Sequence, residues 1–180
     1  IGSAAFAKCL KLTNITVSPA NKEYVCHDGV LYTADGKKLV QYLAGRTRSS
    51  YNMPSSTESI EEYAFWGAPQ LADISLSSKL KEIPEYAFAN CSGLNNVVLP
   101  YNIESLMAYS FSDCYNLQNV VVPDSVGYID EKAFYLTNNV TVNYYDSNEA
   151  KKKVAEAGVP EENFEEYIGS VSSNSYDVRR

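Results

Sequence analysis

The chain has 180 residues, of which 45% are hydrophobic, and it carries a formal net charge of −7 with a pI of about 4.8. The apolar content is typical of a folded protein, whereas the acidic charge argues against a nucleic acid partner, because phosphate contacts need clustered Lys and Arg. No apolar run approaches the roughly 20 residues of a membrane-spanning helix.

The N-terminal segment is the first unit of an internal repeat. Its Ala-Phe pair recurs, with Ser-Phe in one unit, and the phenylalanines lie at Phe6, Phe65, Phe88, Phe111 and Phe134. The last four are spaced by 23 residues, and Phe6 fits the period if an insertion of 36 residues follows its unit. Since the chain starts inside a repeat at Ile1 without the polar cap that terminal repeats need, the sequence predicts repeats or another domain upstream.

Residues 20–50 interrupt the period and contain a predicted β-hairpin. Two alternating segments, Val30–Thr33 and Lys38–Tyr42, flank Asp35-Gly36. Asp-Gly between such segments favours a tight hairpin turn, because Gly accepts a positive φ. The hairpin either projects from the repeats as a contact element or packs sideways as a cap on their edge.

The regular repeats carry further apolar columns at fixed distances from each Phe. Six, nine and eleven residues after it stand Leu71, Leu94 and Leu117; Ile74, Val97 and Val120; and Leu76, Leu99 and Val122. Their alternation predicts a short strand with one inward face. The stretch that ends in each Ala-Phe is too short for a stable α-helix and predicts a single α or 3₁₀ turn. A period of this size predicts a solenoid of stacked units.

The combined motif, Leu-x-x-Ile-x-Leu-Pro followed by Ile-x-x-x-Ala-Phe-x-x-Cys, resembles the BspA-like (Treponema-type) leucine-rich repeats. The resemblance runs from Phe6 to Phe134 and covers most of the chain up to about Tyr145. It implies a right-handed leucine-rich-repeat solenoid over residues 1–145, with the hairpin of residues 20–50 inserted and the strands on the concave face. It also implies an extracellular or cell-surface location, although no signal peptide is visible, and adhesion to host proteins or other cells.

The C-terminal region predicts a helical cap over residues 146–169. Asp146 and Glu149 form a box-like N-cap, and Gly158 followed by Pro160 ends the helix. Residues 170–180 are predicted to be a polar tail.

Three of the four cysteines share one column, three residues after the Phe, at Cys9, Cys91 and Cys114. A small residue in this column predicts a buried, free thiol. The sequence is also compatible with a disulfide between Cys91 and Cys114 in adjacent coils, although side chains of one column tend to point in parallel, which gives poor bridge geometry. Cys26 beside His27 is a poor nucleophile–base pair, because adjacent residues of an extended segment point apart.

The sequence offers no catalytic set. Its adjacent carboxylates, such as Glu61-Glu62 and Glu165-Glu166, lie on predicted surface turns, whereas a glycosidase needs two carboxyls that face each other across a cleft. The single histidine removes His-pair metal sites. We therefore expect neither an enzyme nor a bound metal or cofactor.

Two exposed sets are candidate binding surfaces. The first is a concave strand face eight and ten residues after each Phe, with Thr141 and Asn143 as its continuation; it comprises Asn14, Thr16, Asp73, Ser75, Asn96, Val98, Asn119 and Val121. The second is an aromatic stripe of Tyr63, Trp66, Tyr86 and Tyr109. Stacked Asn side chains either contact a protein or satisfy one another, and stacked rings either bind a ligand such as a sugar or seal the coils.

The sequence therefore favours a non-catalytic, exported binding module that attaches to a protein partner such as a host extracellular protein. A carbohydrate-binding module and a structural spacer of a larger surface protein are the alternatives.

Overall fold

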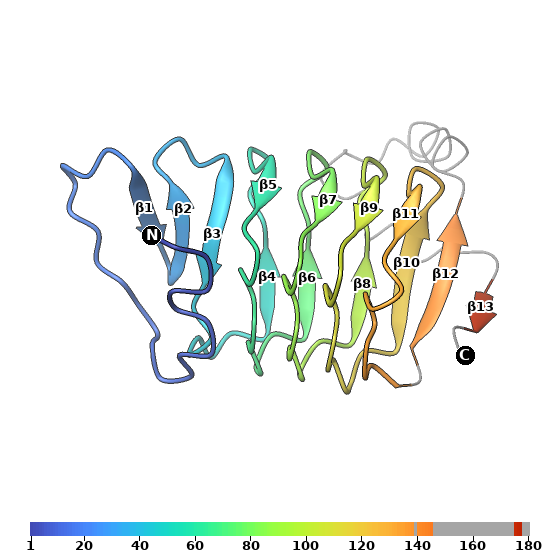
Figure 1. Ribbon diagram of the computed structural model, residues 1–180. Helices are drawn as coiled ribbons and strands as arrows, with labels where there is room; N and C mark the ends of the chain where they lie inside the picture. The colour runs from blue at the N-terminus through green and yellow to red at the C-terminus, as the bar shows by residue number, and fades with distance from the viewer. Residues whose placement is uncertain (139, 146–174, 178–180) are drawn as a thin grey trace.

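The computed structural model describes residues 1–138, 140–145 and 175–177, and it is a β-solenoid of about five turns (Figure 1). Its strands are short, between two and five residues long. They are β1 (Tyr24–His27), β2 (Val30–Thr33), β3 (Lys38–Tyr42), β4 (Ser50–Asn52), β5 (Ser59–Ile60), β6 (Asp73–Ser75), β7 (Glu82–Ile83), β8 (Asn96–Val98), β9 (Ser105–Leu106), β10 (Asn119–Pro123), β11 (Tyr128–Ile129), β12 (Thr141–Tyr145) and β13 (Ser175–Asp177).

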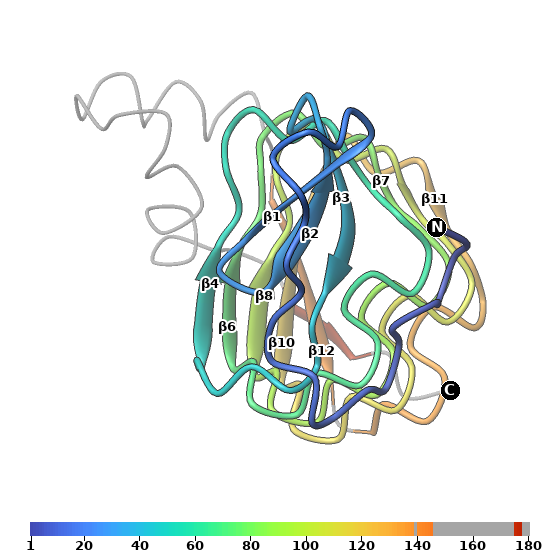
Figure 2. The same ribbon diagram turned by 90° about the vertical axis from the view of Figure 1, so that its left-hand side faces the viewer.

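One strand from each turn joins a six-stranded sheet of order β13-β12-β10-β8-β6-β4, which we call the long sheet. Strands β4 to β12 pair in parallel, and the register partners Ser50, Asp73, Asn96 and Asn119 are 23 residues apart. The coils superimpose when viewed along the axis, with the long sheet on one side (Figure 2). Strands β7, β9 and β11 form a second parallel sheet. Strands β1, β2, β3 and β5 form a third sheet in that order, in which β3 and β5 pair in parallel.

The interior is a single hydrophobic cluster with a stack of aromatic rings along the axis. Phe65 and Phe88 lie 4.7 Å apart between ring centroids, Phe88 and Phe111 5.2 Å, and Phe111 and Phe134 5.6 Å. The ring before Phe65 is Tyr42, at 5.2 Å and 23 residues earlier. Tyr42 therefore continues the Phe column into the region predicted to break the period.

The predicted helical turns are wrong, because the described residues contain no helix. Tyr63 and Gly67, on either side of Phe65, have φ of 62° and 71°, which a helix cannot accommodate. The N–H of Phe65 donates to the carbonyl of Ala87 in the next coil, whereas the N–H of Ala64 donates within its own turn. We call this segment of alternating hydrogen bonds the turn arc; it recurs around Phe88 and Phe111.

The predicted hairpin is confirmed, since β2 and β3 pair antiparallel around Gly36 at φ 71°. It packs sideways: Val30, Tyr32 and Leu39 belong to the core, and β3 pairs with β5. Strand β1 was not predicted; it pairs with β2 across a second Asp-Gly turn, Asp28-Gly29. Both turn residues have positive φ, as a two-residue hairpin turn requires.

The predicted helical cap of residues 146–169 lies outside the described residues. Within the predicted tail of residues 170–180, Ser175–Asp177 form β13, which pairs antiparallel with Thr141–Asn143 of β12. These three residues are therefore attached to the long sheet. An edge strand offers unpaired N–H and C=O groups, and β13 occupies those of β12.

Candidate functional site

The outer face of the long sheet presents two rows of side chains in register, which we call the outer rows. The first row holds Ser50, Asp73, Asn96, Asn119 and Thr141, and the second holds Asn52, Ser75, Val98, Val121 and Asn143. The intervening residues, such as Val97 and Val120, point into the core. Strand alternation therefore sorts inward apolar residues from a face of small side chains.

The structure places six of the eight predicted face residues in the outer rows, but not Asn14 and Thr16. These two residues are exposed on a segment without strand structure that runs against the hairpin, where the N–H of Gly45 donates to the carbonyl of Leu12. Their places are taken by Ser50 and Asn52 of β4. The sequence did contain a signal for this replacement, because Tyr51, which lies between Ser50 and Asn52, aligns with the apolar column at Ile74.

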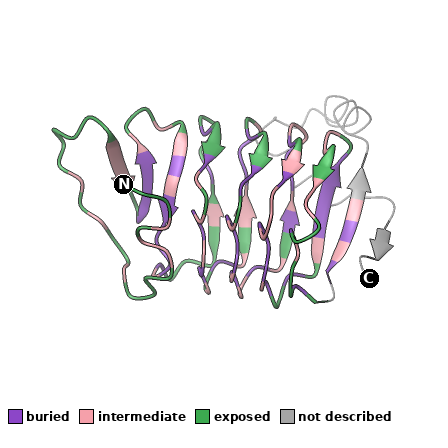
Figure 3. Ribbon diagram, viewed as in Figure 1, coloured by how far each residue is buried: buried purple, intermediate pink, exposed green. Residues whose placement is uncertain are grey.

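Exposure falls along the face toward β10. Strands β4, β6 and β8 carry exposed and half-buried residues, whereas β10 is mostly buried (Figure 3). Val121, predicted to be exposed, is only 6% exposed, because Val98 and Asn143 flank it in register. The Asn119 amide donates to Oδ1 of Asn96 at 2.9 Å, so the predicted mutual satisfaction of stacked Asn side chains occurs here.

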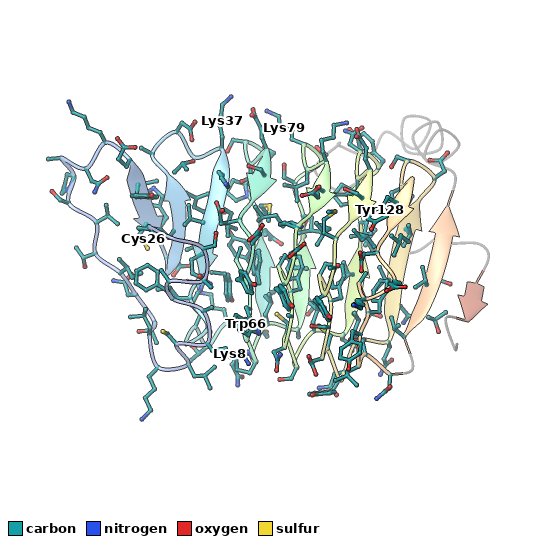
Figure 4. The ribbon with its side chains drawn as sticks, in the orientation of Figure 1. Lys8, Cys26, Lys37, Trp66, Lys79 and Tyr128 are labelled. Atoms are coloured by element: carbon teal, nitrogen blue, oxygen red, sulfur yellow. The ribbon has the colours of Figure 1, made fainter. Side chains whose placement is uncertain are left out.

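The aromatic stripe forms a continuous ladder of rings. Tyr63, Tyr86 and Tyr109 stack with centroids 4.8 Å apart and planes within 9° of parallel. Trp66 lies 5.1 Å from Tyr63, and the ammonium of Lys8 lies 4.5 Å above the Trp66 ring (Figure 4).

This packing limits which faces of the rings in the ladder are free to bind a ligand. Both faces of Tyr86 are covered by neighbouring rings, and partial burial together with the adjacent Tyr109 and Tyr63 phenols raises its pKa. A sugar ring stacks on an open aromatic face, and the central rung offers only its edge. The geometry favours mutual packing that seals the coils.

The cysteine column is a column of hydrogen-bond donors. Cys91 and Cys114 are buried free thiols that donate to the carbonyls of Phe65 and Phe88, each at 3.1 Å. Thr137, which occupies the same column in the last coil, donates to Phe111 at 2.5 Å. Burial raises the pKa of Cys91 to about 12 and places that of Cys114 well above its ordinary value.

The other predicted thiol positions differ. Cys9 is exposed, so the prediction that its column is buried is wrong for the first unit. Cys26 is partly exposed on β1 and lies at the N-terminal edge of the solenoid (Figure 4). Among the described residues, no group of three or more His, Cys, Asp or Glu is placed to hold a metal ion.

A buried cation that the sequence analysis missed lies where the hairpin meets the first coil. The Arg46 side chain is 5% exposed, donates to Asp28 Oδ2 at 3.1 Å and lies 4.6 Å from the centroid of Tyr42. The Tyr32 and Tyr51 hydroxyls are hydrogen bonded beside it. Burial is the main cause that raises the pKa of both phenols. This cluster joins the hairpin to the array and faces inward, away from the outer rows.

Comparison with known proteins identifies the architecture. The profile of the BspA-type leucine-rich repeat region matches residues 44–153 in six copies. The chain belongs to the BspA-type leucine-rich repeat family. The start of the match at residue 44 agrees with an array that begins at Tyr42 and does not include Phe6. A comparison with curated proteins gives no match.

Solved structures of leucine-rich repeat proteins share the fold. A leucine-rich cell surface protein of Faecalibacterium prausnitzii is 28% identical with a TM-score of 0.67, over 82% of this chain and 46% of that chain. The pneumococcal vaccine antigen PcpA is 23% identical with a TM-score of 0.70, over 73% and 33%. A leucine-rich repeat protein of Bacteroides ovatus is 21% identical with a TM-score of 0.54, over 68% and 31%. The chain spans less than half the length of each of these structures.

No helix in the described part of the chain is long and apolar enough to cross a membrane.

Proposed function

We propose that this BspA-type repeat domain is a non-catalytic binding module that docks a protein partner on the outer face of the long sheet. The observation that carries the proposal is the composition of the outer rows. Nine of their ten side chains are uncharged, with Asp73 as the exception. Depletion of charge is typical of the centre of a protein interface.

The surface near the other sheets differs from the outer rows in its charge. The residues directly before the strands of the other sheets form exposed ion pairs, Lys37 with Glu58 at 3.0 Å and Lys81 with Glu104 at 2.9 Å. Charge is therefore present at these turns and depleted on the outer rows, and such a contrast orients a partner while the neutral rows are desolvated.

The partner that fits this face is an exported or host extracellular protein, and the role is adhesion. The support is the repeat family together with a 28% identical structure described as a cell surface protein. The domain acts outside the cell or at its surface. It works without catalysis, cofactor or nucleic acid, in keeping with its net charge of −7.

The test is a pull-down from extracellular-matrix and mucus extract with this chain as bait. The loss variant is Asn52→Arg with Asn96→Arg, which places two charges on exposed positions of the outer rows. The matched control is Ser56→Arg with Gln70→Arg, which adds the same charge at exposed positions outside the long sheet. We expect the parent and the control to recover a protein that the loss variant does not.

Recovery by all three chains would place the contact on another surface and contradict the outer rows. Recovery by none would favour the structural spacer. Circular dichroism of the three chains separates lost binding from lost fold.

A further inference from the structure

The last coil of the array is one residue short. Register partners in the long sheet are 23 residues apart up to Asn119, but Asn119 pairs with Thr141, 22 residues later. Phe134 and Thr137 keep the 23-residue spacing through the aromatic stack and the donor column. The missing residue therefore falls between Thr137 and Thr141.

A surface hollow of about 440 Å³ lies at this step. The residues that line it are Tyr115, Asn116, Leu117, Gln118, Asn119, Asn138 and Thr141. None of them is charged, and buried Leu117 is the one aliphatic side chain among them. The volume lies in the range of small-molecule sites.

The lining offers paired donors and acceptors. Each Asn or Gln amide carries two N–H donors and a carbonyl acceptor, and the Thr141 hydroxyl does both. Two of these side chains are already oriented, because the Asn116 amide donates to the carbonyl of Ser92 at 2.6 Å and the Asn119 amide to Asn96. The remaining polar capacity suits a ligand whose groups also both donate and accept.

An aromatic ring stands at the rim. Tyr115 is 60% exposed, and its hydroxyl donates to Asp113 Oδ1 at 3.0 Å, which fixes the ring and raises the pKa of the phenol. Unlike Tyr86 in the ladder, Tyr115 stacks on no ring among the described residues. An oriented ring with an open face suits the C–H face of a sugar.

We propose that this hollow binds a neutral saccharide unit. Sugar hydroxyls match amide and hydroxyl side chains that both donate and accept, and a pyranose adds an apolar face for Tyr115. The described residues of the lining carry no charged side chain, so they offer no ion-pair partner to an anionic or cationic ligand. The site is separate from the aromatic ladder, and it goes beyond the proposed protein contact, although Asn119 and Thr141 belong to both surfaces.

The experiment uses the full chain on an array of neutral and charged oligosaccharides. Titration with methyl glycosides of neutral hexoses and N-acetylhexosamines follows, read by saturation-transfer NMR. The loss variants are Tyr115→Ala and Gln118→Ala. Both side chains are exposed, and the inter-coil bonds of Gln118 are made by its backbone, so the fold is retained.

The matched control is Tyr128→Ala. Tyr128 is 51% exposed and donates to Asp130 Oδ2 at 3.0 Å, so it copies the local setting of Tyr115 away from the hollow. We expect binding of neutral glycans that each loss variant weakens by about tenfold or more, equivalent to about 1.4 kcal/mol, and that the control retains.

Three results would overturn the proposal: no neutral glycan bound by the parent, equal loss in Tyr128→Ala, or selection of Tyr115-dependent peptides from a library in the absence of glycan binding. The single variant Asn52→Arg changes neither a residue of the hollow nor a hydrogen-bond partner of one, and it should weaken the protein contact but keep glycan binding. Failure of one proposal therefore leaves the other standing.

Discussion

Phe6 and Phe88 belong to the same sequence column, but they lie in different environments. Phe88 is fully buried between Phe65 and Phe111, whereas Phe6 is partly exposed at the N-terminal edge, outside the ring stack. The first unit, residues 1–17, has the apolar residues of a repeat but forms no strand. Burial in a solenoid thus depends on a neighbour on each side as well as on the motif, because each coil covers the next.

Thiol labelling gives the largest expected difference between the two regions. Cys9 and Cys26 should react promptly in the native protein, because they are exposed or partly exposed. Cys91 and Cys114 are buried neutral thiols and should react only when the array opens, at least about a thousandfold more slowly for a domain of ordinary stability. Mass spectrometry of the labelled peptides measures this, and equal rates at Cys9 and Cys91 would contradict the packing of the column.

The buried thiol of Cys91 should make the stability of the fold depend on pH. The folded pKa of Cys91 is about 12, against an ordinary value of 9.0, so the folded state keeps a proton that the unfolded chain releases. The stabilisation is fully present below pH 9 and is lost as the pH rises from 9 toward 12. Urea unfolding of the parent and of Cys91→Ala over this range should show a smaller decline in the variant.

Phe88→Ala should lower the free energy of unfolding by about 3–5 kcal/mol, because it removes a ring with neighbours on both faces. Phe6→Ala should cost less than about 1.5 kcal/mol, since its ring is partly exposed. Urea denaturation compares the two. Equal losses would mean that the first unit is packed as tightly as the array.

Thr137→Val should cost about 1–3 kcal/mol. The hydroxyl donates to the carbonyl of Phe111 and accepts the N–H of Cys114, and valine leaves both buried groups unpaired. The matched change in the N-terminal segment is Thr16→Val at an exposed position, which should alter stability by less than about 0.5 kcal/mol. Thermal unfolding followed by circular dichroism distinguishes them, and a neutral Thr137→Val would contradict the donor column.

Tyr42→Phe should stabilise the protein by about 1 kcal/mol. The Tyr42 hydroxyl is buried without a hydrogen-bond partner in the described part of the chain, and phenylalanine restores the residue found elsewhere in this column. Tyr51→Phe is the control, because its hydroxyl is bonded to Tyr32, and it should be destabilising. A loss of stability in Tyr42→Phe would reveal a partner for that hydroxyl.

The solenoid, its period and the inward columns could be predicted, because identical steps place identical residues in contact. The start of the array could not be predicted, since its first coil has Gln41-Tyr42 at the position that Ala-Phe occupies in other coils. Gln41 fits because its buried side-chain amide donates to the carbonyls of Tyr63 and Ala64. The second Asp-Gly turn at Asp28-Gly29 was a signal that the sequence analysis overlooked.

Of the candidate surfaces, the rows from Asp73 to Asn119 followed from spacing alone. The hollow did not, because the placement of Thr141 after Asn119 indicates a shortened last unit but does not indicate which side chains surround the space beside it. The left-handed conformation of Tyr63, Tyr86 and Tyr109 was also hidden, since tyrosine carries no preference for it.

The turn arc has a mechanical consequence. Each coil is tied to the next by hydrogen bonds in the arc and in the long sheet, and these bonds run along the solenoid axis, so tension on the two ends loads one inter-coil boundary at a time. A coil that detaches releases 23 residues, or about 80 Å of extended chain. Pulled by the attached ends in a force spectrometer, the array should lengthen in steps of that size and so act as an extensible tether.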